Sequence, residues 1–174
     1  MAKKPDYQTP TTWAEVDLAT EVAEAKRRFE AELKYLGLTA CTAKPVVKIK
    51  PMKRARGNHA DSLAVYRSGS AIFGNPIFWI SDTFVETARE YRLRPSDVKG
   101  SLLDTIYHEY GHALCDLLRF VDRRNGTDTY RRLVLARHRD EEVFAEEFGA
   151  VLAGRSASGY VFDTIEAIKT ALAE

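Results

Sequence analysis

The sequence predicts an α+β fold, in which a small mixed sheet packs over one amphipathic helix and a mostly helical C-terminal half follows. Helical spacing of apolar residues near the N-terminus gives way to alternating segments between residues 44 and 81, and helical spacing then returns. The length of 174 residues fits a single domain. We therefore expect one domain over residues 1–174, with residues 1–40 forming an N-terminal leader and a helix to which the sequence assigns no role.

The first helix is expected to begin after Thr12. Thr12 and Glu15 have the spacing of a capping box, in which each side chain bonds the backbone N–H of the other residue. The apolar residues that follow at helical spacing are Val16, Ala19, Val22, Ala23, Phe29, Leu33 and Leu36. Gly37 is a suitable C-terminal cap, so we expect the helix to end there.

Three segments then alternate in the manner of strands: KPVVKIKPM at 44–52, SLAVY at 62–66 and PIFWIS at 76–81. The segment RSGSAIFGN at 67–75 predicts a turn, a short strand and a second turn. A helix is expected from Ser81 or Asp82 to about Tyr91, followed by a loop over 92–100.

The remaining chain is predicted to be helical. The strongest helix runs from about Ser101 to Val121, and its apolar face is formed by Leu103, Ile106, Tyr110, Ala113, Leu114, Leu117 and Val121. Further helices are expected over about 128–138, over 140–153 with Gly154 as the stop, and from Asp163 onward.

The composition excludes several classes of protein. The chain is 45% hydrophobic and 29% charged with a formal net charge of +1, so no strong global field indicates a nucleic acid or a membrane as partner. Neither a signal peptide nor a membrane span is visible. Two distant cysteines suit a reducing compartment, and we expect a cytoplasmic protein. A basic segment at 44–56 leaves nucleic-acid binding open, although a solvated strand and loop are the commoner explanation.

One motif carries chemistry: His108, Glu109 and His112 form the pattern H-E-x-x-H within DTIYHEYGHALCDLL at 104–118. Given the four histidines in the chain, a shuffled sequence of this composition would contain the pattern about 0.007 times. On a helix the two histidines lie one turn apart, opposite the apolar face, and two such imidazoles can bind one metal ion. Glu109 lies to one side, where it can reach a metal-bound water without binding the metal.

A second acidic helix follows at DEEVFAEEFGAVLAG, residues 140–154. The run Glu142-Val-Phe-Ala-Glu146-Glu-Phe148-Gly149, after H-E-x-x-H, resembles the gluzincin pattern and the Glu-x-x-Ala-Asn-x-Phe-Ala pattern of the ImmA/IrrE-type bacterial metallopeptidases. The resemblance covers residues 100–152. It implies a zincin-like fold and a catalytic Zn2+ bound by His108, His112 and Glu142. His138, Glu141 and Glu146 remain open alternatives for the third ligand.

The same resemblance implies roles for the other site residues. Glu109 would be the general base and acid, and Glu146 would be the carboxylate that holds a zinc-binding histidine. The chain is thus expected to hydrolyse peptide or protein substrates. A second donor to the developing oxyanion would be Tyr130, His138 or Tyr160. A substrate strand could add to a sheet edge at SGSAIFGN or NPIFWIS. The alternatives are a regulatory protease acting on one partner, and a zinc-binding interaction module without catalysis.

Overall fold

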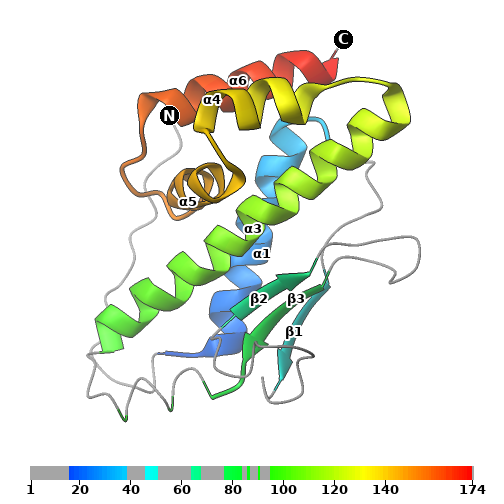
Figure 1. Cartoon of the computed structure of the whole chain (residues 1–174). Helices are drawn as coiled ribbons and strands as arrows, with labels where there is room; N and C mark the ends of the chain where they lie inside the picture. The colour runs from blue at the N-terminus through cyan, green and yellow to red at the C-terminus, as the bar shows by residue number, and fades with distance from the viewer. Residues whose placement is uncertain are drawn as a thin grey trace.

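The computed structural model describes residues 16–38, 46–50, 64–67, 77–83, 86, 90 and 95–173. Helices dominate these residues and three short strands form one sheet, an arrangement that agrees with the predicted α+β class (Figure 1). The long helix α3, Pro95–Asn125, runs across the whole molecule. The sheet lies toward its N-terminal half, α4 and α6 lie toward its C-terminal half, and α5 packs against its middle.

The sheet contains β1, Val46–Lys50, β2, Ala64–Arg67, and β3, Ile77–Ser81, in the order β1-β3-β2. β3 pairs parallel with β1 and antiparallel with β2, so the sheet is mixed as predicted. All three alternating segments therefore form strands. The short strand expected at 68–75 and most of the helix expected at 82–91 fall outside the described residues.

Helix α1, Leu18–Tyr35, begins later than predicted. Asp17 is the N-cap in extended conformation, and its carboxylate accepts hydrogen bonds from Ala19 N at 3.1 Å and from the Thr20 hydroxyl at 2.5 Å. The predicted cap Thr12 lies outside the described residues. The end agrees with the prediction, because Gly37 has φ +78° and the Leu38 N–H donates to Leu33 O at 2.8 Å, as in a Schellman motif.

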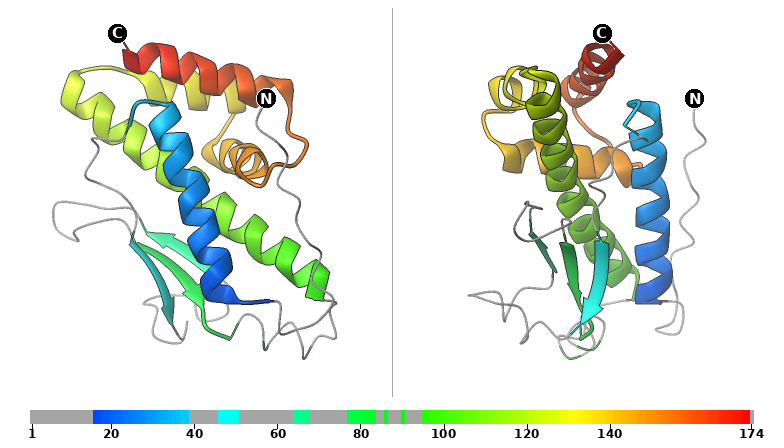
Figure 2. Two further views of the ribbon diagram at one scale, coloured as in Figure 1. Left: turned by 180° about the vertical axis from the view of Figure 1, so that it is seen from behind. Right: turned by 90° about the vertical axis from the view of Figure 1, so that its right-hand side faces the viewer.

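The apolar face of α3 packs on α1, which lies behind α3 in the view of Figure 1 and crosses it in Figure 2. Tyr110 stacks on Phe29 with ring centroids 4.4 Å apart. The buried residues of this face are Ile106, Tyr107, Tyr110, Ala113, Leu114, Leu117 and Leu118. β2 also packs against α3. The helix is longer than predicted because it starts at Pro95, a residue favoured in the first turn of a helix.

The C-terminal half contains a π-helical segment η3, Tyr130–Leu135, a short α4, Ala136–His138, then α5, Glu141–Leu152, and α6, Gly159–Ala173. Asp140 caps α5 by accepting from Val143 N at 2.9 Å, and Gly154 follows the helix at φ +68°, as predicted. Helix α6 starts four residues before the predicted Asp163. The Ser158 hydroxyl accepts from Val161 N at 3.3 Å and provides the earlier cap.

Helices α3 and α5 approach each other at backbone distance. A Cβ added at Gly111 of α3 would lie 2.4 Å from Ala145 Cα of α5. One added at Gly149 of α5 would lie 3.0 Å from the backbone nitrogen of His108. Glycine at both positions therefore brings the first turn of α5 close to the histidine face of α3.

Candidate metal centre

The two histidines of the motif converge from one face of α3. The His108 and His112 rings meet edge to face with centroids 4.9 Å apart, and their Nε2 atoms are 3.2 Å apart. Both residues are half-buried, whereas the residues on the opposite face of the helix are in the core. This placement agrees with the one-turn spacing read from the sequence.

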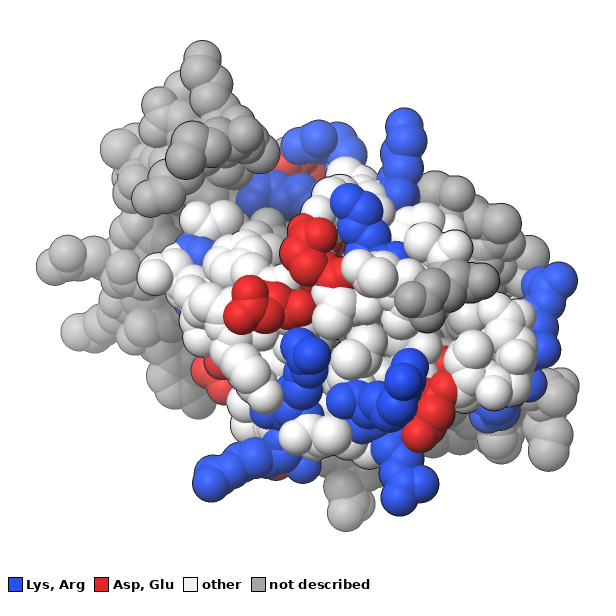
Figure 3. Space-filling view, turned by 90° about the horizontal axis from the view of Figure 1, so that it is seen from above, with Lys and Arg blue, Asp and Glu red and all other residues white. Residues whose placement is uncertain are grey.

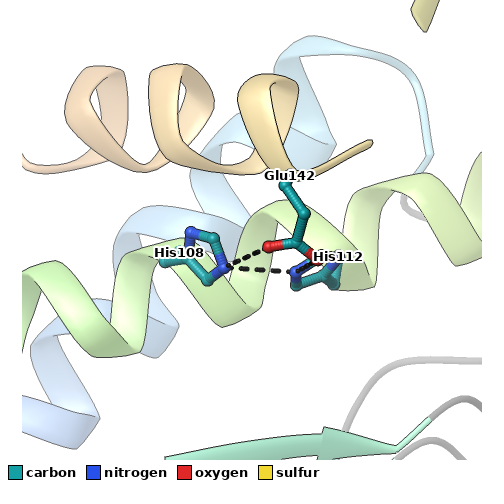
Figure 4. Close-up of side chains that lie close together, drawn as sticks. All are labelled: His108, His112 and Glu142. Atoms are coloured by element: carbon teal, nitrogen blue, oxygen red, sulfur yellow. Dashed lines mark hydrogen bonds and ion pairs between the residues drawn. The ribbon is translucent and has the colours of Figure 1, made fainter. Parts of the chain in front are cut away.

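Glu142 reaches the same point from the first turn of α5 (Figure 4). Its Oε2 lies 3.3 Å from His108 Nε2 and its Oε1 lies 3.4 Å from His112 Nε2. One candidate ligand atom from each of the three residues lies within 4.8 Å of the others. Bonds of about 2.0–2.1 Å to a tetrahedral metal would separate ligand atoms by roughly 3.3–3.4 Å. The three side chains therefore fit one small metal ion.

The other edge of His112 is held by Glu141, the residue next to the predicted ligand. His112 Nδ1 lies 2.8 Å from Glu141 Oε1. The second carboxylate oxygen accepts hydrogen bonds from the Tyr130 hydroxyl at 2.7 Å and from the Arg119 guanidinium. Arg119 also donates to Asp116 at 3.1 Å, and its guanidinium lies 4.1 Å from the centroid of the Tyr130 ring.

These contacts set the charges at the site. Burial opposes ionisation of Glu141, but hydrogen bonds from His112 and Tyr130 and the charge of Arg119 outweigh it and lower its pKa to about 2. The hydrogen bond with Glu141 is the main cause of a raised pKa at His112. Burial, followed by the neighbouring His112, lowers the pKa of His108, which favours the neutral imidazole that a metal requires.

Glu109 and Glu146 lie nearby with less direct contacts. Glu109 is half-buried beside His108 on α3, and its negative charge contributes to the raised pKa of His112. Glu146 is exposed one turn beyond Glu142, and its charge acts to raise the pKa of His108, against burial. Within the described part of the chain, we find no hydrogen bond donated by either histidine to Glu146. Its role in holding one of them stays a prediction, and Glu141 is the carboxylate on His112.

The candidates for the oxyanion donor are separated by the fold. The Tyr130 hydroxyl bonds Glu141, on the side of His112 away from the metal ligands. His138 is buried between Glu147, 2.9 Å from its Nδ1, and Thr164, 2.9 Å from its Nε2. Tyr160 is 48% exposed and lies against the His138 ring. The structure brings none of the three into hydrogen-bond contact with His108, His112 or Glu142.

The sheet edge expected to bind a substrate strand was assigned without its tertiary context. β3, at NPIFWIS, is the central strand and is paired on both sides, so the prediction that it forms a free edge for a substrate strand is wrong. The segment SGSAIFGN lies outside the described residues. Cys115, three residues after His112, is buried on the core side of α3, and burial raises its pKa well above the usual range.

A basic surface lies on elements other than the segment at 44–56, most of which is outside the described residues. Figure 3 looks down from above on Figure 1 and shows Lys and Arg side chains spread around a smaller group of acidic ones. The exposed arginines at the end of α3 and along η3 and the turn after α4 are Arg123, Arg124, Arg131, Arg132 and Arg139. In the part of the chain that the structure describes, no helix has the length and apolar character needed to cross a membrane.

Comparison with known proteins gave no match: no protein family, no curated protein and no solved structure is significantly similar to this chain.

Proposed function

We propose that this chain is a zinc-dependent metallopeptidase of the gluzincin type, with a zincin-like fold. His108, His112 and Glu142 would be its metal ligands. The observation that carries the proposal is the convergence of the three side chains: one ligand atom from each lies within 4.8 Å of the others, the two Nε2 atoms are 3.2 Å apart, and each of them has a Glu142 carboxylate oxygen at 3.3 or 3.4 Å. Two imidazoles and one carboxylate are a ligand set of catalytic zinc, which keeps a fourth position for water.

The access to the site also favours catalysis over a purely structural metal. The Glu142 side chain is 71% exposed, so the site opens toward solvent on the α5 side. A structural zinc site is commonly closed by four protein ligands, and the only group of potential ligands found among the described residues contains three. A general base is of no use to a structural site, yet Glu109 lies directly beside the ligand pair.

The division of work among the residues follows from their positions. Zinc bound here would supply a water of lowered pKa and a Lewis acid for the substrate carbonyl. Glu109 would take the proton of the water as it attacks the carbonyl carbon and return it to the amine nitrogen of the departing peptide. His108 and His112 would bind the zinc through their Nε2 atoms from α3, and Glu142 would provide the third ligand from α5.

A stoichiometry experiment tests the metal site first. Purified protein is expected to carry about one zinc per chain, removable by a strong chelator, and His108→Ala or His112→Ala should abolish it. Glu109→Gln keeps the size of the side chain but cannot take a proton, so it should keep both the zinc and the fold while losing hydrolysis of a peptide library by orders of magnitude. Glu30→Gln, on the exposed face of α1, is the matched control.

The results separate the alternatives. Full zinc occupancy in both histidine variants would remove the proposed site. Release of zinc by Glu109→Gln would show that Glu109 is a ligand and not the base. A wild-type protein that binds zinc but cleaves no peptide in the library would favour a protease with one specific partner, or a zinc-binding module without catalysis.

A further inference from the structure

The hydrogen-bond partners of His112 define which of its nitrogens carries the proton. Nδ1 faces the Glu141 carboxylate at 2.8 Å, and Nε2 faces His108 and Glu142. An ionised carboxylate can only accept, so Nδ1 must carry the hydrogen. In the neutral ring, Nε2 is then left with its lone pair directed at the position where three ligand atoms meet. Glu141 thereby selects the tautomer that can bind a metal.

Glu141 would lose this effect if its side chain were free to rotate. Its second oxygen is fixed by Arg119 and Tyr130, and its side chain is only 20% exposed. Arg119 comes from α3, two turns after His112, and Tyr130 opens η3. Each of the two is in turn anchored, Arg119 by Asp116 and Tyr130 by a backbone hydrogen bond of 2.7 Å to Asp122. The carboxylate is thus held from two separate elements.

We propose that Arg119 and Tyr130 are positioning residues of the metal centre, which act through Glu141 to hold His112 with Nε2 toward the metal. This inference rests on the proposed zinc site and adds a role for residues outside the ligand set. It also reassigns Tyr130, because a hydroxyl that donates to Glu141 behind His112 is not available to an oxyanion on the metal side.

The alternative explanation is that Arg119 and Tyr130 have a purely structural role, since the same contacts connect α3, η3 and α5. The two explanations predict different effects of replacing Arg119 when Glu141 is absent. A positioning residue that acts through Glu141 has no effect on zinc once Glu141 is removed. Replacing a residue that only connects elements lowers the stability of the fold with or without Glu141, and does not change the tautomer of His112.

The test is a double-mutant cycle on zinc affinity. Glu141→Ala is expected to weaken zinc binding about 10–100-fold, and Arg119→Ala and Tyr130→Phe to weaken it in the same direction by smaller factors. Arg119→Ala should cause no further loss in the Glu141→Ala background. Glu141→Gln, which keeps an acceptor oxygen, should recover part of the affinity. Arg123→Ala, an exposed position one turn further along α3, is the matched control and should bind as the wild type does.

Nitrogen NMR of the metal-free protein gives a second readout that does not depend on zinc. At a pH where the His112 ring is neutral, the wild type should show His112 with its hydrogen on Nδ1, and Glu141→Ala or Arg119→Ala should shift it toward a mixture of tautomers. Unchanged tautomer and unchanged zinc affinity in Arg119→Ala and Tyr130→Phe would overturn the proposal. Tyr130→Phe removes a single oxygen and decides the question if Arg119→Ala does not fold. If the wild type binds no zinc, the proposed function fails, while the tautomer still tests the positioning.

Discussion

Replacing Gly111 by alanine tests how closely the two ligand-bearing helices must pack. The new Cβ would lie 2.4 Å from Ala145 Cα and 2.8 Å from both Ala145 Cβ and Ala145 O. Carbon atoms in contact prefer separations of about 3.5–4.0 Å, so the helices would have to move apart by roughly 1 Å. None of the three atoms belongs to a flexible side-chain end, and rotamer changes cannot relieve the contact.

The expected effect on stability follows from two opposing terms. Overpacking of a core costs about 1–3 kcal/mol, and a rigid backbone contact belongs at the upper end. Alanine in place of glycine in a helix returns about 1 kcal/mol. The net free energy of unfolding should fall by about 2 kcal/mol, which corresponds to a Tm roughly 4–8 °C lower for a chain of this size. Zinc affinity should fall too, because Glu142 moves with α5.

Thermal unfolding with and without zinc measures both effects. Gly159→Ala is the matched control, since an added Cβ there has no heavy atom within 4 Å. That variant should be as stable as the wild type or gain up to about 1 kcal/mol. If Gly111→Ala behaves like Gly159→Ala in both Tm and zinc affinity, the reasoning about the helix crossing is wrong.

Three further outcomes are expected. Glu142→Ala should weaken zinc binding more than Glu146→Ala, because Glu142 is a proposed ligand and Glu146 is an exposed carboxylate that acts on the site only through its charge. Titration with a zinc indicator gives the order, and the reverse order would make Glu146 the ligand. Burial lowers the pKa of His138, and the charge of Arg137 acts in the same direction, against the opposing effect of Glu147. As the pH falls below about 6.5, the unfolded chain therefore gains a proton at His138 that the folded chain does not take up. The free energy of unfolding should then fall by at most about 1.4 kcal/mol per pH unit, until the pH reaches the lowered pKa of His138 in the folded protein. Urea unfolding of metal-free wild type and His138→Gln between pH 5 and 7.5 isolates this contribution, and equal slopes in the two proteins would contradict it. Removal of zinc by a chelator should lower the Tm of the wild type, and should not change that of His112→Ala, since a ligand of the folded state stabilises it by mass action.

The sequence predicted those parts of the molecule that depend on local periodicity. Residues one helical turn apart share a face whatever surrounds them, so His108 and His112 could be placed together from spacing alone. Alternation with a period of two placed the three strands, and the tolerance of glycine for positive φ placed the C-terminal cap at Gly37. N-caps for which several nearby side chains could serve as acceptor were less well predicted: Asp17 and Ser158 became the caps of α1 and α6, while the sequence favoured positions several residues away.

The partner of His112 could not be derived from spacing. On α5, Glu146 is the residue one turn from Glu142, and it was therefore the natural supporting carboxylate. Glu141 points about 100° away around the helix. Its contact with His112 depends on how α5 crosses α3, and that crossing depends on Gly111 and Gly149, whose need for close approach is visible only in three dimensions. The π-helical turn that brings Tyr130 to Glu141 has no periodic signature either.

The exposed carboxylates at the start of α5 have a kinetic consequence. Glu141 is neutralised by Arg119, but Glu142 and Glu146 are both exposed beside the histidine pair. A local negative field of this kind accelerates the encounter with a divalent cation, and added salt screens it. In stopped-flow measurements, Glu146→Gln should therefore slow zinc association and weaken its dependence on ionic strength while leaving the dissociation rate constant nearly unchanged. Glu146 would then determine how fast the site is loaded, and Glu142 how long the ion stays.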